Sequence, residues 1–146
     1  MILQVKGLDF RYKKRYVLKD INFHVFENEL VAILGPNGVG KTTMLRCINS
    51  ILKPENGSII LGEREISSMT PGDIARLISY VPQRNEQNRL TAFDSILLGR
   101  KPHIGWKIME DDLMKVDAVI QNLGLSDLAV IYIDEMSGED LQKISI

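Results

Sequence analysis

The chain has 146 residues, a formal net charge of −1 at pH 7, 45% hydrophobic residues and 25% charged residues. Such a chain is long enough for a sizeable core, and its balanced charge argues against nucleic acid as the main partner. No apolar run approaches the eighteen or so residues that span a bilayer. The first residues lack the layout of a signal peptide, so we expect a cytoplasmic location. The single cysteine, Cys47, excludes an internal disulfide and is expected in the core.

The N-terminal segment predicts a small antiparallel sheet. Residues 2–5 alternate weakly between apolar and polar side chains, and residues 16–25 alternate more clearly. Residues 13–15, Lys-Lys-Arg, form a charged turn between the two predicted strands. The apolar face of the second strand is expected to carry Val17, Ile21, Phe23 and Val25.

A glycine-rich stretch at residues 35–43 has the form G-x-x-x-x-G-K-T, which is the pattern of a phosphate-binding P-loop. Its glycines let the backbone curl so that successive N–H groups point inward at an anion. Lys41 supplies a charge for the β- and γ-phosphates, and the Thr42 hydroxyl can bind Mg²⁺. Residues 29–34 predict a buried strand before the loop, and residues 42–52 have helical spacing after it. This order predicts that the chain binds a nucleoside triphosphate at the start of a helix.

The middle of the chain is expected to contain two further strands and a short helix. Residues 53–57 break the first helix and lead into a strand at residues 58–61. Thr70 is the expected cap of the short helix. Residues 77–81 then predict a strand, and the polar residues 83–89 predict a surface loop.

From Thr91 onward the pattern is helical and shows no strand alternation. Thr91 is expected to cap a helix that runs to Leu98, with Asp94 completing a near capping box. A second helix is predicted to end near Gly124, and its apolar stripe comprises Met109, Leu113, Val116, Ile120 and Leu123. We therefore expect a first domain at residues 1–90 and a helical one at residues 91–146.

The last stretch supports two interpretations. Residues 129–135 could form a Walker B strand, with Asp134 on Mg²⁺ and Glu135 polarising water. Residues 136–143, Met-Ser-Gly-Glu-Asp-Leu-Gln-Lys, instead resemble the Leu-Ser-Gly-Gly-Glu/Gln-x-Gln signature of ABC-transporter ATPases. We favour the second interpretation because other segments resemble that family in the same order.

The resemblance to the ABC nucleotide-binding domain covers nearly the whole chain. Tyr12 precedes the P-loop as the family's adenine-stacking aromatic does, and residues 80–83, Tyr-Val-Pro-Gln, resemble its Q-loop. Together with that segment, residues 97–103 resemble importers of the iron–siderophore, haem or cobalamin type. The resemblance implies an α/β P-loop NTPase fold with an N-terminal antiparallel β-subdomain, a partial RecA-like core and a helical subdomain. The C-terminal core strands of the family would be lacking.

The same resemblance implies ATP and Mg²⁺ as cofactors. It gives catalytic roles to Lys41 and Gln83, and metal binding to Thr42 and Gln83. Ser137 and Gly138 would meet the γ-phosphate of a nucleotide held by a second copy. The implied nucleotide-binding set is Tyr12, Asn37, Gly38, Gly40, Lys41, Thr42, Thr43, Ser137 and Gly138.

The partners implied by the resemblance are a transmembrane permease subunit and, when ATP binds, a second copy in a head-to-tail homodimer. The chain would then be peripheral on the inner face of the cell membrane.

Simpler interpretations of three residues remain open. The Tyr12 ring could be an aromatic packed in the sheet, and Gln83 a solvated residue of a polar loop. Ser137 could be an ordinary N-cap with Asp140 at the third helical position, which is compatible with anion binding at that helix start.

Two departures from the family pattern bear on function. Glu139 stands where the family has the second glycine of its signature, and the family's Walker B strand, catalytic glutamate and switch histidine would lie after Ile146. We therefore expect a truncated importer subunit that binds ATP and Mg²⁺ with weak or absent hydrolysis. The alternatives are a non-hydrolysing nucleotide-binding module and a small P-loop enzyme that uses Asp134 and Glu135.

Overall fold

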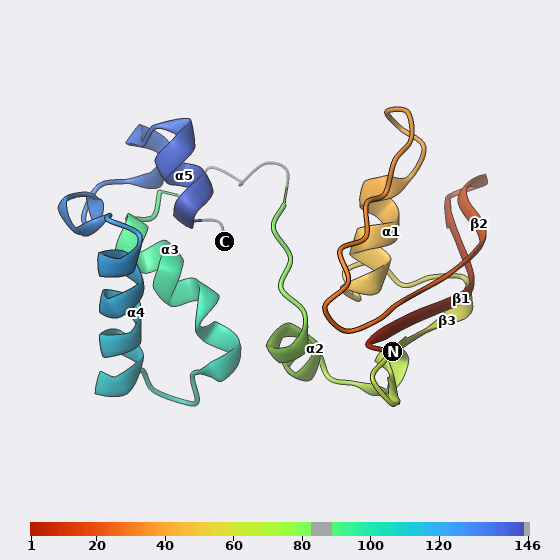
Figure 1. Cartoon of the computed structure of the whole chain (residues 1–146), viewed down its shortest axis with the longest axis horizontal. Helices are drawn as coiled ribbons and strands as arrows, with labels where there is room; N and C mark the ends of the chain where they lie inside the picture. The colour runs from red at the N-terminus through yellow and green to blue at the C-terminus, as the bar shows by residue number, and fades with distance from the viewer. Residues whose placement is uncertain (83–88, 145–146) are drawn as a thin grey trace. The chain divides into compact units, whose positions relative to one another are not determined.

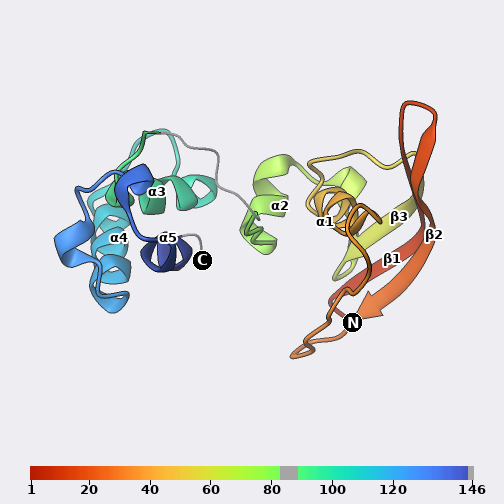
Figure 2. The same cartoon turned by 90° about the horizontal axis from the view of Figure 1, so that it is seen from above.

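The computed structural model describes residues 1–82 and 89–144, and the chain divides into two compact units. The first unit comprises Met1–Ile78 and the second Ser79–Ile146. Figure 1 and Figure 2 show the sheet in the first unit and the helices in the second. Gln83, to which the resemblance gives a catalytic and metal-binding role, lies outside the described residues.

The first unit is built on an antiparallel sheet, as the sequence predicts. The strands have the order β2-β1-β3-β4. Their bounds are β1 Leu3–Tyr12, β2 Arg15–Val25, β3 Asn56–Leu61 and β4 Arg64–Glu65. A two-residue turn joins the long strands β1 and β2 at the position expected for the charged turn.

A β-bulge in β2 changes which side chains face the core. Phe10 pairs with Leu18 while Arg11 pairs with Tyr16, so Val17 is an extra residue in the ladder. Leu18 is 4% exposed, whereas Val17 is only half-buried. A second register shift, between the pairs Leu8–Ile21 and Phe10–Leu18, sets three residues of β2 against two of β1. The face that carries Ile21 and Phe23 therefore continues at Leu18, and the predicted place of Val17 on that face is wrong.

The core of the first unit lies between the sheet and the helices that follow it. These are α1 (Lys41–Ile48), the short helix η1 (Ile66–Ser68) and α2 (Pro71–Leu77). Cys47 is 1% exposed, as expected, and desolvation raises the pKa of its thiol to about 11. The buried core residues are Val5, Leu8, Phe10, Leu18, Met44, Cys47, Ile48, Ile59, Ile66, Met69 and Ile74.

The predicted cap of α2 is confirmed by its hydrogen bonds. The Asp73 amide donates to the Thr70 hydroxyl oxygen at 3.2 Å, and that hydroxyl donates to the Asp73 carboxylate at 2.7 Å. The strand predicted at residues 77–81 is wrong. Helix α2 continues through Leu77, and residues 78–82 have no regular structure, because the capped helix takes up the start of the apolar run.

The buried strand predicted at residues 29–34 is also wrong. Within the described residues this segment has no strand partner, and Leu30 and Leu34 are 97% and 90% exposed. A strand with apolar side chains on both faces is stable only between neighbouring strands and covering helices. The described part of the chain does not supply them, so the segment has no regular structure and stays exposed.

The second unit is helical, as its pattern predicts. Its elements are α3 (Ala92–Gly99), η2 (Lys101–His103), α4 (Glu110–Asn122), η3 (Ser126–Leu128), η4 (Ile133–Glu135) and α5 (Gly138–Ile144). The predicted capping at Thr91 is confirmed, since its hydroxyl accepts from the Asp94 amide at 3.1 Å. The core of this unit contains Val116, Ile120 and Leu125.

The predicted apolar stripe of α4 is only partly correct. Met109 and Leu113 are 64% and 41% exposed, whereas the side chain of Asp112 is buried in their place. Asp112 accepts a hydrogen bond from Arg100, so an ion pair, rather than an apolar side chain, occupies the buried position near the start of α4. The predicted helix end is confirmed, because Gly124 follows α4 with φ of +66°. No helix in the described ranges is long and apolar enough to cross a membrane.

Candidate nucleotide-binding site

The P-loop enters α1 through glycines with left-handed backbone conformations. Gly38 has φ of +80°, and Gly40, the N-cap of α1, has φ of +109°. A Cβ atom added at Gly40 would lie 2.9 Å from Val17 Cγ1 and 3.0 Å from the Val17 carbonyl oxygen. Gly40 is therefore required both by its own conformation and by the close approach of β2.

The start of α1 presents backbone donors rather than a side-chain cap. The first N–H groups of any α-helix have no partner within the helix, and here no side chain bonds to them at the cap. The first turn contains no acidic residue, while Arg46 lies in the last turn. The local charge thus favours an anion at this end, which is what a phosphate chain needs.

Lys41 lies across the loop that precedes its own helix. Its ammonium donates hydrogen bonds to the carbonyl oxygens of Gly35 at 2.6 Å and Pro36 at 2.9 Å. These bonds keep the charge at the mouth of the loop, next to the N–H groups of the helix start. A phosphate there would meet the ammonium and the backbone donors together.

The remaining P-loop residues differ in exposure. Asn37 and Thr42 are exposed, whereas Thr43 is 9% exposed and sits between the loop and the core. The Thr42 hydroxyl is thus available as an oxygen ligand, which suits a hard cation such as Mg²⁺. The residues described contain no group of three or more His, Cys, Asp or Glu that could hold a metal ion by themselves. A magnesium ion at Thr42 would therefore need phosphate oxygens to complete its coordination.

Tyr12 lies at the end of β1, next to the hairpin turn. Its side chain is 48% exposed, and its ring packs edge-on against Phe10 with ring centroids 4.9 Å apart. The packing against Phe10 agrees with the simpler interpretation of Tyr12 as a sheet aromatic. The exposed part of the ring still leaves a surface on which a base could stack.

The bulge at Val17 and the neighbouring Leu18 contribute to the site in a way that the sequence pattern did not predict. Both side chains approach Gly40, and the Cβ built there would lie 3.1 Å from Leu18 Cδ2. This contact fixes the hairpin against the P-loop. Alternation patterns cannot reveal it, because a bulge breaks the alternation on which they depend.

The signature-like segment lies in the second unit, where Ser137 precedes α5. The Ser137 hydroxyl donates to the Asp140 carboxylate at 2.6 Å and accepts from the Asp140 amide at 3.2 Å. The hydrogen bond from Ser137, with a second one from Lys143, holds the pKa of Asp140 below its ordinary value. Ser137 is therefore an N-cap, as the simpler interpretation predicts, and a role for Ser137 and Gly138 at a γ-phosphate stays a prediction.

The Walker B interpretation of residues 129–135 is wrong. These residues form a turn, an isolated bridge between Tyr132 and Thr91, and the short helix η4, which contains Asp134 and Glu135. The carboxylates consequently do not follow a buried strand. The apolar run that suggested a strand instead packs partly against the helices, with Ala129 next to the core and Ile133 buried.

The geometry of loop and helix is that of a P-loop, a motif suited to phosphate groups. Comparisons with known proteins define the family. A sequence model described as "ABC transporter" matches residues 18–146. An uncharacterized ABC transporter ATP-binding protein of Methanocaldococcus jannaschii is 47% identical over 146 residues, which is all of this chain and 58% of that protein.

Two further proteins extend this result. A probable iron chelatin transport ATP-binding protein of Helicobacter pylori is 32% identical over 99% of this chain and 58% of its own length. The solved structure of cbiO1 from Clostridium perfringens, described as part of an ABC transporter complex, has a TM-score of 0.76 and 29% identity. The matched region covers 99% of this chain and 59% of the chain in that structure. The chain belongs to the ABC transporter ATP-binding family and spans just under three fifths of these relatives' length.

Proposed function

We propose that this chain binds ATP with Mg²⁺ at the P-loop, as part of the ATP-binding subunit of an ABC importer. The observation that carries the proposal is the position of the Lys41 ammonium, which is hydrogen-bonded to Gly35 and Pro36 at the uncapped start of α1. This arrangement supplies fixed positive charge and backbone donors to a phosphate chain without rearrangement of the loop.

Individual residues of the chain would hold different parts of the nucleotide. Tyr12 stacks on adenine, and the backbone of residues 37–40 and the Lys41 ammonium surround the β- and γ-phosphates. Bound Mg²⁺ neutralises charge on these phosphates, and the Thr42 hydroxyl supports its position. Thr43, at the buried end of the loop, holds the helix start against the core. Gln83 is proposed to touch the metal or the attacking water, as the family resemblance implies.

The proposed substrate class is an iron chelate or a related metal complex of the siderophore, haem or cobalamin type. Residues 97–103 and the name of the Helicobacter pylori relative support this class. Coupling would require a transmembrane permease subunit, which would hold the chain peripherally at the cytoplasmic face of the membrane. ATP would join two copies head to tail, with Ser137 and Gly138 of one copy at the γ-phosphate of the other.

Titration calorimetry with ATP and MgCl₂ tests the proposal on the 146-residue chain, a Lys41→Ala variant and an Arg46→Ala variant. Arg46→Ala is the matched control, because this substitution removes one positive charge from the same helix at the end away from the loop. We expect wild type and Arg46→Ala to bind alike and Lys41→Ala to bind at least tenfold more weakly, since one charge-assisted contact is lost. No heat from wild type, or equal binding by all three, contradicts the proposal.

Phosphate release in the same samples separates the proposed subunit from a self-sufficient enzyme. We expect turnover far below the usual enzyme median of roughly 10 s⁻¹, because the carboxylates of η4 do not follow a strand as a Walker B pair would. Turnover of tens per second by this chain contradicts that expectation.

A second candidate is a nucleotide-binding module that dimerises without hydrolysis. It is favoured by the carboxylates in the first turn of α5, where Asp140 accepts from Ser137 and Glu139 is 84% exposed. Both negative charges oppose a γ-phosphate at this helix start. ATP-dependent dimerisation in sedimentation velocity, with no phosphate release on addition of a permease, would favour this candidate.

A further inference from the structure

The hairpin between β1 and β2 directs two side chains to the same face of the sheet. Tyr12 and Arg15 are direct cross-strand partners, so their side chains leave the sheet on one side. Phe10, two residues before Tyr12 on β1, is buried in the core together with Met44 and Cys47 of α1. The side shared by Tyr12 and Arg15 is therefore the one that packs against α1.

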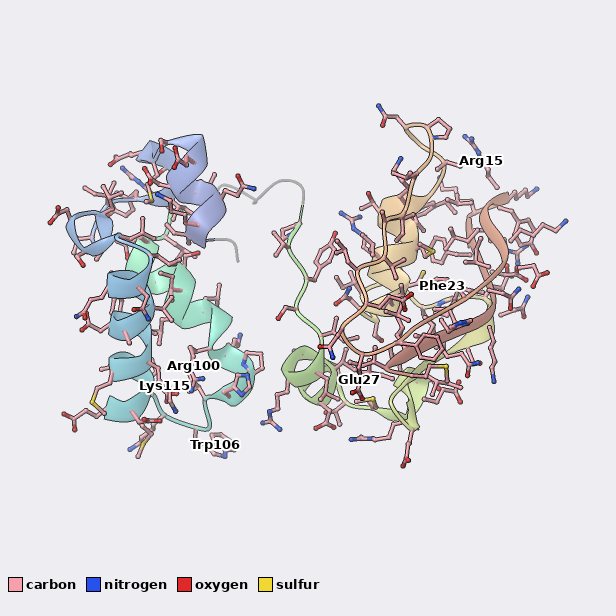
Figure 3. The ribbon with its side chains drawn as sticks, in the orientation of Figure 1. Arg15, Phe23, Glu27, Arg100, Trp106 and Lys115 are labelled. Carbon is pink, nitrogen blue, oxygen red and sulfur yellow. The ribbon has the colours of Figure 1, made fainter. Side chains whose placement is uncertain are left out.

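The start of β2 also lies against the P-loop. Two residues after Arg15, Val17 comes within 2.9 Å of a Cβ atom built at Gly40. Two residues of strand cover about 7 Å, a distance that an extended arginine side chain can reach. Arg15 thus lies beside Tyr12 and two residues before the part of β2 that meets the start of α1, and Figure 3 labels it at the hairpin end of β2.

In the described part of the chain, no acidic side chain lies within ion-pair distance of Arg15. Arg11 differs, because it pairs with Glu55 and lies over the ring of Tyr16, its own cross-strand partner. The first turn of α1 likewise contains no acidic residue that could compete for the guanidinium. A cation in this position has a phosphate as its natural partner.

We propose that Arg15 is a further nucleotide-binding residue, and that its guanidinium binds the α-phosphate between the base on Tyr12 and the phosphates at Lys41. The inference rests on the proposed function, since it requires a nucleotide at the P-loop. It assigns to the hairpin a contact that ATP and ADP share. The loop contacts at Lys41, by contrast, include the γ-phosphate that only ATP has.

Titration calorimetry with ATP and with ADP, each with MgCl₂, tests this assignment on the full chain. We expect Arg15→Ala to weaken both nucleotides about tenfold and to leave the ratio of their affinities unchanged. Lys14→Ala is the matched control, because it removes the same charge from the adjacent turn residue, and its affinities should stay within twofold of wild type. Arg15→Lys should recover part of the loss, since it keeps the charge but not the planar pair of donors.

Three results would overturn the inference alone while wild type still binds. These are equal affinities of Arg15→Ala and wild type, an equal loss in Lys14→Ala, and a loss for ATP without a loss for ADP. The second would indicate that the positive charges of the hairpin attract the nucleotide without a specific contact from Arg15. The third would indicate that Arg15 contacts the γ-phosphate. If wild type itself binds neither nucleotide, the proposed function fails first and the inference fails with it.

Discussion

At the scale of single residues, Gly40 is the P-loop position with the strictest structural requirements. Its φ of +109° is one that residues with side chains rarely adopt, and a Cβ atom added there would lie 3.0 Å from the backbone oxygen of Val17. The residue therefore has to be glycine for two separate reasons, the conformation of the loop and the packing of the hairpin against it.

We expect Gly40→Ala to lower the free energy of unfolding by about 2 to 3 kcal/mol, because strain and a backbone clash add. Gly99→Ala is the control, since the end of α3 has no heavy atom within 4 Å of an added Cβ, and alanine favours a helix there. Urea denaturation followed by circular dichroism measures both variants. Equal midpoints for the two variants would contradict the role given to Gly40.

At the scale of elements, the corner between α3 and α4 depends on one ion pair. Arg100 Nη2 donates to Asp112 Oδ1 at 2.8 Å, and the Met109 amide donates to Asp112 Oδ2 at 3.2 Å. The carboxylate thereby joins the residue that follows α3 to the first turn of α4. Figure 3 labels Arg100 in this corner and the exposed Trp106 in the connection that it closes.

This ion pair predicts a pH dependence of stability. The hydrogen bond from Arg100, with one from the Met109 amide, holds the pKa of Asp112 below its ordinary value. A lowered folded-state pKa means that the contribution is complete above the unfolded value of about 3.9 and is lost as the pH falls through the folded value. Asp112→Asn should therefore lower the urea midpoint at pH 7 and lose its effect towards pH 2.

Asp111→Asn provides the comparison for this prediction. Asp111 is the neighbouring carboxylate on α4, but it is 63% exposed and pairs with Lys115 on the same helix. Such exposed pairs contribute little to stability. The two asparagine variants should differ at pH 7 and converge in acid, and a constant difference across this range would exclude the proposed role of the Arg100–Asp112 pair.

The sequence correctly predicted those elements that are stabilised by residues close together in the chain. The hairpin, the caps at Thr70 and Thr91 and the end of α4 at Gly124 all depend on residues close in sequence, and all were predicted. The exposed segment at residues 29–34 shows the opposite case, because its apolar pattern specifies a strand only when other strands lie beside it.

The site shows the same division. The P-loop is a contiguous motif, so the residues at the start of α1 could be named from the sequence. The burial of Asp112 and its ion pair were not predicted, because a first-turn carboxylate can be recognised as buried only when its partner, Arg100, is known to be near. The contact between Val17 and Gly40 was missed because it crosses from a strand to a loop more than twenty residues away in sequence.

At the scale of the whole molecule, the described residues form two separate cores, and neither of these covers the apolar segment at residues 29–34. Leu30 and Leu34 are almost fully exposed within residues 29–34. Exposed apolar residues that no core covers are a site where chains associate.

We expect the double substitution Leu30→Lys and Leu34→Lys to weaken self-association of the chain at least tenfold, since burial of two leucines is removed. The unfolding midpoint should stay unchanged because neither side chain is in a core. Ser67→Lys with Ser79→Lys is the control, which adds the same two charges at exposed polar positions. Sedimentation velocity over a concentration series measures association, and an equal effect of both pairs would attribute it to charge alone.

The buried thiol of Cys47 gives this molecule a built-in chemical reporter. Only the thiolate reacts with an alkylating reagent, and a solvent-excluded sulfur with a pKa of about 11 is scarcely ionised at neutral pH. Labelling must therefore wait until the helix behind the P-loop separates from the sheet. Because the sequence contains no other cysteine, the rate of modification records that opening event directly, and a ligand seated on the loop would slow it.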